Sequence, residues 1–367
     1  MPQNSFSFSA QLWKRLKKNK GAVFGLLVIV LAFLVAVFGY LLAPDNSPNA
    51  DLQTVEIQAK KPGYAQLFLK IPDAKNSFPG NWVVKLVGGS PANYRYLPIS
   101  KYLIKGDSLI VHKYVDEDTS MIQVYSINQL TNNQPQKISS QNIITKKYWL
   151  GTDKFGRDIL SRLIIGTRVS LAVGLIAVLI SLTLGIILGA LAGYYRGRTD
   201  AAIMWLVNVT WSIPTLLLVF AITMALGKGF WQIFIAVGLT LWVSVARLIR
   251  GQVMALKELE YIQAAKALGL SDSRIILRHI LPNILGPVMV IAASNFATAI
   301  IIEAGLSFLG IGVQPPQPSW GLMIKENYNF IITHNPILAL VPGFAIMLLV
   351  LAFNLLGNGL RDAVDVR

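Results

Sequence analysis

Runs of roughly 20 apolar residues recur along this chain, and each run is long enough to cross a hydrocarbon core about 30 Å thick. Charged residues make up only 14% of the 367 residues, whereas soluble domains carry about 25%. The pattern therefore predicts an all-α polytopic membrane protein. Its six predicted transmembrane helices cover residues of about 21–43, 168–194, 203–226, 230–248, 282–302 and 336–357.

Basic residues lie beside these runs and give the chain a net charge of +15. Loops that face a cytoplasm and anionic lipid carry such an excess, so we predict a lipid bilayer as the partner and no nucleic acid. The basic stretch 14–20 precedes a first run that is too long for a signal peptide. This indicates a retained anchor with a cytoplasmic N-terminus. Alternating spans then place residues 194–200, residues 260–283 and the C-terminal tail on the cytoplasmic side as well.

Residues 45–147 have a different character, because short alternating runs are separated by turn residues. This pattern is typical of a small antiparallel β unit. We expect a mainly-β insertion on the extracytoplasmic side, either with a role of its own or as a lid or spacer. Its lone histidine, His112, stands among lysines and is predicted to be a surface residue rather than a ligand. A polar loop is expected at 131–137. The predicted strands are 55–61, 65–71, 81–89, 108–115 and 121–127.

The chain offers no set of residues for chemistry inside the membrane. It has no cysteine, which excludes disulfides, thiolate metal sites and cysteine nucleophiles. The cores of the spans hold essentially no ionisable groups, with Glu303 at the outer end of the fifth, so an ion-coupled transporter and a membrane protease are both disfavoured. No G-x-x-x-x-G-K-[ST] loop occurs. We therefore predict no catalytic residue, no metal and no cofactor, and a partner that hydrolyses ATP if ATP drives this protein.

Residues 260–283 form a polar segment between the fourth and fifth runs. Good helix formers fill residues 256–268, with acidic side chains near the start that favour the positive end of the helix dipole. Gly269 follows and can adopt the positive φ that ends a helix. Ser271 is a plausible N-cap for a second helix that runs toward Pro282. We expect a helix, a tight turn and a second helix on the cytoplasmic side.

Two features of this segment favour contact with another protein. Arg274 and Arg278 are four residues apart and share one face of the second helix. Ala264 and Ala265 make the centre of the segment small enough to enter a groove. A helix that lies on the lipid surface has a similar composition, so composition alone leaves both interpretations open.

The spacing of these residues resembles the EAA motif of ABC importer permeases, EAA-x3-G-x9-I-x-LP. Gln263 replaces the glutamate of that motif and loses its charge, and His279 replaces the isoleucine. The positions that match are Ala264, Ala265, Gly269 and the pair Leu281 and Pro282. The resemblance implies that residues 257–279 are a coupling helix seated in a cleft of an ATPase. The implied coupling residues are Gln263, Ala264, Ala265, Gly269, Ser271, Arg274 and Arg278.

Further stretches resemble the second (C-type) permease subunit of dipeptide, oligopeptide and nickel ABC importers, and they occur in the family's order. The resemblance covers about 12–44 and 148–367, and it omits the β segment because the corresponding loop of the family is short. We divide the chain accordingly into 1–44, 45–147 and 148–367. The matching stretches are 12–32, 149–171, 303–321 and 354–367.

The resemblance implies a membrane-spanning permease subunit of an ATP-driven importer for di- or oligopeptides or a related small solute. It implies as partners a second permease subunit, two P-loop ATPase subunits and an extracytoplasmic solute-binding protein. The implied location is the bacterial cytoplasmic (inner) membrane, with both termini cytoplasmic and residues of about 45–165 outside. The alternatives are a secondary transporter or channel that acts alone, and a membrane-anchored protein that interacts through the β insertion. The substrate-binding residues are unknown from the sequence.

Three other motifs are predicted to be structural. In 149–171, apolar residues at helical spacing lie opposite charged ones, with Arg157 and Arg162 beyond the lipid core; this favours packing over substrate contact. The prolines at 315–318 predict a stiff loop that ends in an interfacial aromatic anchor, Trp320. Glycines at every fourth position of the second span favour close helix packing over the lining of a pore; they are Gly185, Gly189 and Gly193.

Overall fold

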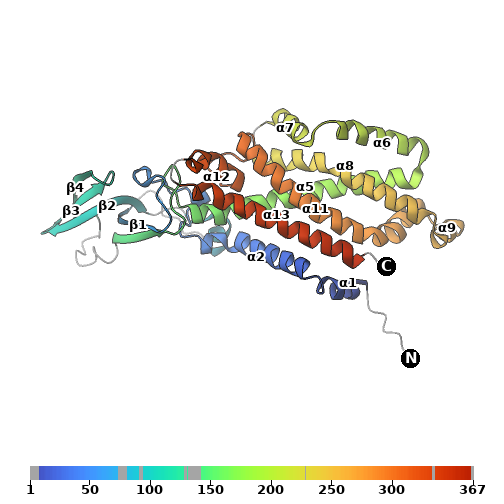
Figure 1. The fold of residues 1–367 in the computed structure, drawn as a ribbon, viewed down its shortest axis with the longest axis horizontal. Coiled ribbons are helices and arrows are strands. Elements are labelled where there is room, and N and C mark those ends of the chain that lie inside the picture. The colour runs from blue at the N-terminus through green and yellow to red at the C-terminus, as the bar shows by residue number, and fades with distance from the viewer. Residues whose placement is uncertain are drawn as a thin grey trace, which may run out of the picture. The chain divides into compact units, whose positions relative to one another are not determined.

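The computed structural model describes residues 8–72, 81–90, 94–127, 130, 142–227, 229–332 and 335–364. The chain forms two units. The first comprises Met1–Phe33, Val169–Gln314 and Phe344–Arg367, and the second comprises Leu34–Arg168 and Pro315–Gly343. The first unit is helical, and the second contains the five-stranded sheet (Figure 1).

Long apolar helices confirm the predicted polytopic helical fold. Five helices of the described residues are long and apolar enough to cross a membrane, and a bent pair makes a sixth candidate. Most of them extend beyond the predicted spans, because amphipathic turns continue the helices past their apolar cores. Five of the predicted spans each correspond to one long helix. In chain order, the first, second, fourth, fifth and sixth spans are α2 (Lys20–Leu42), α5 (Ile159–Tyr195), α8 (Phe230–Lys257), α11 (Leu285–Leu309) and α13 (Ile337–Val364). A short helix, α1 (Phe8–Leu16), precedes α2.

The predicted third span is broken into two helices, α6 (Gly197–Ser212) and α7 (Thr215–Leu226), which are bent by 96°. Pro214 lies at the break. Proline has no N–H for the helix and disfavours helical geometry in the residue before it, and Ile213 is extended, with a ψ of 128°. The span predicted over 203–226 is therefore not one continuous helix, and six spans are reached only if the bent pair counts as one.

Close contact between α5 and α8 confirms the packing role predicted for the glycines of α5. A Cβ atom at Gly185 would lie 2.4 Å from the Cβ atom of Val245. A Cβ atom at Gly189 would lie 2.5 Å from the carbonyl oxygen of Ala246, and Gly193 is packed in the same way. Because no side chain fits at these positions, the two helix backbones approach each other closely.

An antiparallel sheet with the order β4-β3-β2-β1-β5 confirms the predicted β unit. Alternate residues bury one face of the sheet, among them Leu69, Leu97 and Leu109. The turn that precedes the strand predicted over 108–115 contains Gly106, whose φ is 60°. The strands are β1 (Tyr64–Pro72), β2 (Tyr94–Lys105), β3 (Ser108–Tyr114), β4 (Ser120–Ser126) and β5 (Ile143–Tyr148).

The strand predicted over 81–89 is wrong, because these residues contain a helix, α3 (Trp82–Gly88). The N–H groups of Val84 and Lys85 both donate to the carbonyl oxygen of Asn81 and close the first turn. Gly89 ends the helix with a φ of 79°. None of the α3 residues is buried, so the apolar character that suggested a strand does not reflect a place in the sheet.

The strand predicted over 55–61 is also wrong, since only a 3-10 turn, η2 (Val55–Ile57), forms there. Conversely, β2 and β5 were not predicted, because their lysines and tyrosines obscure the alternation of apolar residues. The loop predicted at 131–137 lies outside the described residues. The remaining elements of this unit are η1 (Pro48–Ala50), α12 (Trp320–Asn327) and η7 (Tyr328–Ile331).

Candidate functional site

The predicted coupling segment begins where α8 ends, at Lys257. Leu259 is extended, with φ −73° and ψ 141°, and α9 (Glu260–Ala267) starts after it. The single helix predicted over 256–268 is therefore wrong in its first turn. The side chain of Gln263 stabilises the break, because its Nε2 donates to the carbonyl oxygen of Glu258 at 3.0 Å. An ionised glutamate could not donate this bond, since its carboxylate only accepts hydrogen bonds.

Gly269 ends α9 as predicted, with a φ of 79°. Its N–H donates to the carbonyl oxygen of Lys266 at 3.0 Å, and the N–H of Leu270 donates to that of Ala265 at 3.2 Å. These are the two hydrogen bonds of a Schellman motif, in which glycine takes the left-handed conformation. A Cβ atom on Gly269 would contact nothing within 4 Å. Backbone geometry, and not lack of space, selects glycine at this turn.

The second helix of the segment is shorter than predicted. Ser271 occupies the N-cap position of α10 (Asp272–Ile275), but its side chain makes no capping hydrogen bond. The chain then passes through a π turn, η5 (Ile276–Ile280), and a 3-10 turn, η6 (Leu281–Ile284), into α11. Pro282 has no N–H to donate and lies in η6. The expected helix, turn and helix are present, with irregular turns in place of most of the second helix.

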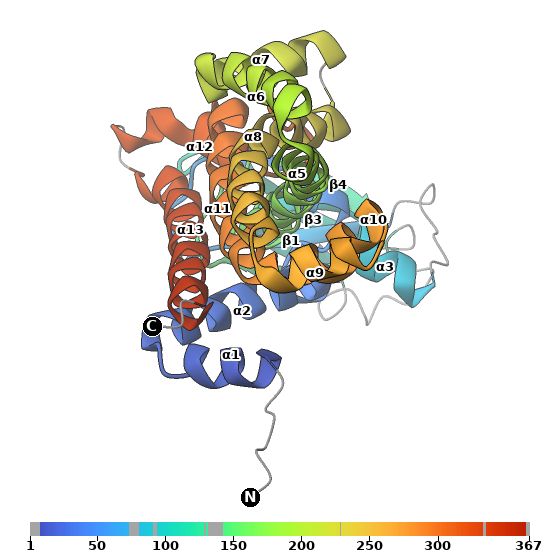
Figure 2. The ribbon, with the colours of Figure 1, turned by 90° about the vertical axis from the view of Figure 1, so that its right-hand side faces the viewer.

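One side of this segment packs on the protein and the other side is exposed. Ala265 joins Ile262 and Ile275 in a buried apolar cluster, so the two alanines of the motif face opposite ways. Two large apolar side chains are exposed, Leu268 at 81% and Leu277 at 63%. Figure 2 shows α9 and α10 next to each other. The exposed members of the predicted set are Gln263, Ala264, Gly269, Ser271, Arg274 and Arg278.

The C-terminal end of α5 holds the segment through contacts that the sequence alone did not indicate. The hydroxyl of Tyr194 donates to Oδ1 of Asp272 at 2.7 Å. The Nζ atom of Lys257 donates to the carbonyl oxygen of Tyr194 at 2.6 Å. Arg196 forms an ion pair with Glu258 at 2.5 Å. The polar side chains that tie the segment to α5 therefore lie just before α9, at Lys257 and Glu258, and at the start of α10, at Asp272.

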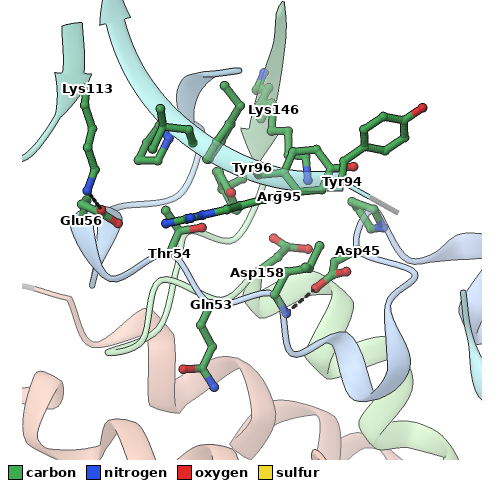
Figure 3. A pocket seen from close by; sticks show the side chains of 17 residues that line it. Asp45, Gln53, Thr54, Glu56, Tyr94, Arg95, Tyr96, Lys113, Lys146 and Asp158 are labelled. Atoms are coloured by element: carbon green, nitrogen blue, oxygen red, sulfur yellow. Dashed lines mark hydrogen bonds and ion pairs between the residues drawn. The ribbon is translucent and has the colours of Figure 1, made fainter. Parts of the chain in front are cut away.

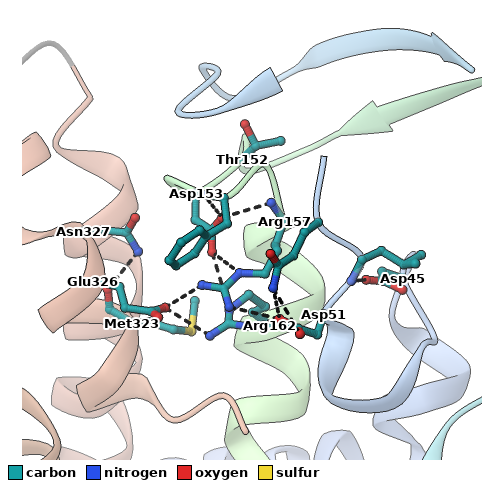
Figure 4. Close-up of polar contacts among 12 residues, drawn as sticks. Asp45, Asp51, Thr152, Asp153, Arg157, Arg162, Met323, Glu326 and Asn327 are labelled. Atoms are coloured by element: carbon teal, nitrogen blue, oxygen red, sulfur yellow. Dashed lines mark hydrogen bonds and ion pairs between the residues drawn. The ribbon is translucent and has the colours of Figure 1, made fainter. Parts of the chain in front are cut away.

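A second polar centre lies in the unit that contains the sheet, where two buried arginines meet three carboxylates (Figure 4). The side chains of Arg157 and Arg162 are 2% and 1% exposed. Arg157 contacts Asp153 at 2.6 Å, Glu326 at 2.7 Å and Asp51 at 3.1 Å. Arg162 contacts Glu326 at 3.3 Å. The network joins the segment after α2, the start of α5 and the helix α12.

This network corrects the expectation that the charged residues of 149–171 lie opposite a packed face. Burial disfavours the charge of Arg157, but Asp153 and Glu326 outweigh burial and raise the pKa of its guanidinium. The partners Arg157 and Glu326 are 169 positions apart in the chain. No local pattern pairs residues at that distance, so the sequence did not indicate these partners.

Trp320 is not the interfacial anchor that the sequence predicted. Its side chain is buried, at 4% exposure, and its Nε1 donates to the carbonyl oxygen of Leu163 at 3.1 Å. The ring lies against Gly166, where a Cβ atom would come within 3.1 Å of it. The stiff proline loop therefore delivers Trp320 into the protein, where its N–H has a partner.

Other predicted residues carry little chemistry. His112 is partly buried on β3, with Nδ1 at 3.4 Å from Oγ of Ser120. Among the described residues, no three His, Cys, Asp or Glu side chains lie close enough to hold a metal ion.

Comparisons with known proteins address the family directly. A family profile described as "Binding-protein-dependent transport system inner membrane component" matches residues 185–367. A second profile, described as "N-terminal TM domain of oligopeptide transport permease C", matches residues 7–59. The MetNI methionine ABC transporter in an inward-facing conformation superimposes with a TM-score of 0.47, at 19% identity, over 57% of this chain and 98% of its own.

Several curated relatives are permeases. The glutathione transport system permease protein GsiD of Pectobacterium atrosepticum is 44% identical over 218 residues, which are 59% of this chain and 72% of the relative. The dipeptide transport system permease protein DppC of Alkalihalophilus pseudofirmus is 45% identical over 60% of this chain and 72% of its own. The oligopeptide transport system permease protein OppC of Bacillus subtilis is 40% identical over the same shares. The chain therefore belongs to the binding-protein-dependent permeases of the inner membrane, as a C-type permease subunit of the dipeptide, oligopeptide and nickel group of ABC importers.

Proposed function

We propose that residues 260–283 receive the motion of the ATPase subunits and pass it to the membrane helices. The observation that carries this proposal is the division of the segment into an exposed face and an attached face. The exposed face offers Leu268 and Leu277 with two arginines nearby, as expected of a surface that enters a cleft of another protein. The attached face is bonded to the end of α5 through Tyr194. Displacement of the segment therefore acts directly on a transmembrane helix.

The rest of the assembly follows from the family. We propose that the chain pairs with a second permease subunit, is driven by two P-loop ATPase subunits and receives its solute from an extracytoplasmic binding protein. Large side chains on α6 and α7 are exposed, among them Trp205 at 67% and Leu217 at 58%, which supports a partner or lipid over this bent pair. The names of the relatives support short peptides as the imported class.

We also propose the orientation and the division of the chain predicted above. Both termini are cytoplasmic and residues of about 45–165 lie outside, so that 1–44, 45–147 and 148–367 are an anchor, an insertion and a permease core. Impermeant maleimide applied to right-side-out vesicles tests this. Lys105→Cys in the insertion should be labelled, whereas Lys266→Cys in α9 should be labelled only after lysis. The opposite pattern would reverse the topology.

Cross-linking tests the coupling proposal itself. The chain contains no cysteine, so a single introduced thiol reports on one position. Ala264→Cys lies on the exposed face and should cross-link to a cysteine placed in the ATPase cleft. Ala265→Cys is the matched control, because Ala265 is buried, at 8% exposure, and a thiol at this position should not react.

Two outcomes would count against the proposal. Equal cross-linking from positions 264 and 265 would show that the segment does not dock by its exposed face. Purification of a transport-active chain without any ATPase would favour the alternative of a secondary transporter or channel that acts alone.

A further inference from the structure

A cavity of about 360 Å³ lies in the unit that contains the sheet, between β2, β5 and the residues that follow α2. Its volume is at the lower end of the range of small-molecule sites, about 300–1,000 Å³. Acidic and basic side chains line different sides of it. Figure 3 shows Asp45 and Asp158 on one side, and Arg95, Tyr96 and Lys146 on the other. None of these residues belongs to the coupling segment.

The acidic side of the cavity contains an oxygen atom without a partner. Asp45 and Asp158 are 7% and 5% exposed. Both oxygens of Asp45 accept backbone N–H groups, from Ser47 and Leu52. Oδ2 of Asp158 accepts the N–H and the hydroxyl of Ser161, whereas its Oδ1 has no partner among the described residues. Burial raises the pKa of Asp158. Because a buried acceptor without a donor is costly, a ligand that donates at this point would stabilise the site.

The basic side of the cavity combines aromatic rings with cations. The Nζ atom of Lys146 lies 3.4 Å from the centroid of the Tyr96 ring, and burial lowers the pKa of Lys146 to about 8. Lys113 is already neutralised by Glu56 at 2.9 Å. Arg95 also lines the cavity and is exposed. Its guanidinium is therefore the cation best placed to receive a negative group from solvent.

We propose that this cavity binds a small zwitterion, whose ammonium group donates to Asp158 and whose carboxylate meets Arg95. A simple anion would be repelled by the two buried carboxylates, and a simple cation would be repelled by Lys146 and Arg95. A metal ion fits poorly, because the described residues contain no group of three metal-ligating carboxylate, imidazole or thiolate side chains. Amino acids and short peptides carry both charges at a separation that a cavity of this size accommodates. The proposal concerns binding by this chain alone and does not depend on coupling or transport.

Calorimetric titration of the full-length chain in lipid nanodiscs tests the proposal, with the dipeptide L-alanyl-L-alanine as the probe. Dialanine should bind saturably. N-acetyl-dialanine, which lacks the ammonium group, and dialanine amide, which lacks the carboxylate, should each bind about tenfold more weakly, because each loses one charged hydrogen bond. Asp158→Asn and Arg95→Gln should each weaken dialanine binding by a similar factor. Arg95 is exposed, so Arg95→Gln should leave the fold intact. It therefore tests the proposal even if Asp158→Asn does not fold.

Two control variants make the same kinds of substitution, Asp to Asn and a basic residue to Gln, at positions that do not line the cavity. Asp118→Asn lies in the turn before β4, and Lys105→Gln lies at the end of β2; both residues are exposed. Both variants should bind dialanine like the unmodified chain. The proposal is overturned if dialanine shows no saturable binding at millimolar concentration. It is also overturned if the blocked peptides bind as well as dialanine, or if Arg95→Gln binds like the controls.

Discussion

Gly269 provides the sharpest test of the coupling proposal, because its backbone conformation and not its surroundings excludes other residues. Its φ of 79° is left-handed, and a Cβ atom there would contact nothing within 4 Å. The left-handed conformation costs an ordinary L-residue about 1–2 kcal/mol, and asparagine much less. If the ATPase binds only the native turn, a cost of this size weakens its binding by at most about 5- to 30-fold.

The test compares Gly269→Asn, Gly269→Ala and Gly269→Val in a complex reconstituted with the ATPase and the binding protein. Backbone strain predicts that asparagine is tolerated best, alanine less well and valine least. Steric exclusion from the cleft predicts instead that alanine, the smallest, is tolerated best. The assay is ATPase activity stimulated by loaded binding protein, with the affinity of the purified ATPase measured in parallel. If Gly269→Ala outperforms Gly269→Asn, the reasoning from backbone strain is wrong.

A control separates strain from added bulk in the same segment. Ala267 is exposed in the last turn of α9, where Ala267→Val adds the same side chain at an ordinary helical φ. This variant loses at most about 0.7 kcal/mol of helix propensity. It should retain most of the stimulated ATPase activity. If Gly269→Val transports normally and still stimulates the ATPase, the coupling role of the turn is refuted.

Three further predictions concern packing and charge. Gly189→Ala should lower the midpoint of thermal unfolding, because its Cβ atom would lie 2.5 Å from a carbonyl oxygen of α8 and overpacking costs about 1–3 kcal/mol; Gly251→Ala, with nothing within 4 Å, should raise it. Arg157→Gln should lower the free energy of unfolding by about 3–5 kcal/mol, because it leaves buried carboxylates unpaired. Adding Glu326→Gln to this variant should restore part of the loss. If the losses of the two single variants simply add in the double variant, the network is contradicted. Lys146 should titrate near pH 8 in NMR spectra of 13C-methylated lysines. Because the unfolded chain then holds a proton that the native chain has lost, stability rises with pH from about 8 to 10.5; a midpoint near 10.5 would exclude the buried position.

The transmembrane part of the fold could be predicted because lipid imposes one length and one composition on every span. The bend in the third span could have been predicted too, since Pro214 stands in the middle of an apolar run. The sheet was harder. The strands β2 and β5 carry lysines and tyrosines among their apolar residues, and no residue of α3 is buried. Alternation of apolar and polar residues indicates a strand with one buried face. A strand or helix whose burial does not follow that alternation is therefore missed or assigned wrongly.

The candidate site shows the same limit at a longer range. The turn at Gly269 was predictable, because the conformation of one residue is a local property. The contact of Tyr194 with Asp272 joins residues 78 positions apart, and that of Arg157 with Glu326 joins residues 169 apart. Such pairs follow from the tertiary fold and not from local spacing. The sequence showed an excess of basic residues in 149–171, but it indicated neither the burial of Arg157 and Arg162 nor the carboxylates that pair with them.

Gln263 was the weakest point of the sequence comparison, because the family motif has a glutamate there. The structure supplies a physical reason for the amide. The backbone breaks between α8 and α9, and the carbonyl oxygen of Glu258 at that break accepts the Nε2 atom of Gln263. A carboxylate could not donate to this oxygen and would add a charge beside Glu258 and Glu260. Glu260 places a negative charge at the start of α9, where the helix dipole favours it, and the Gln263 side chain bonds to the backbone break.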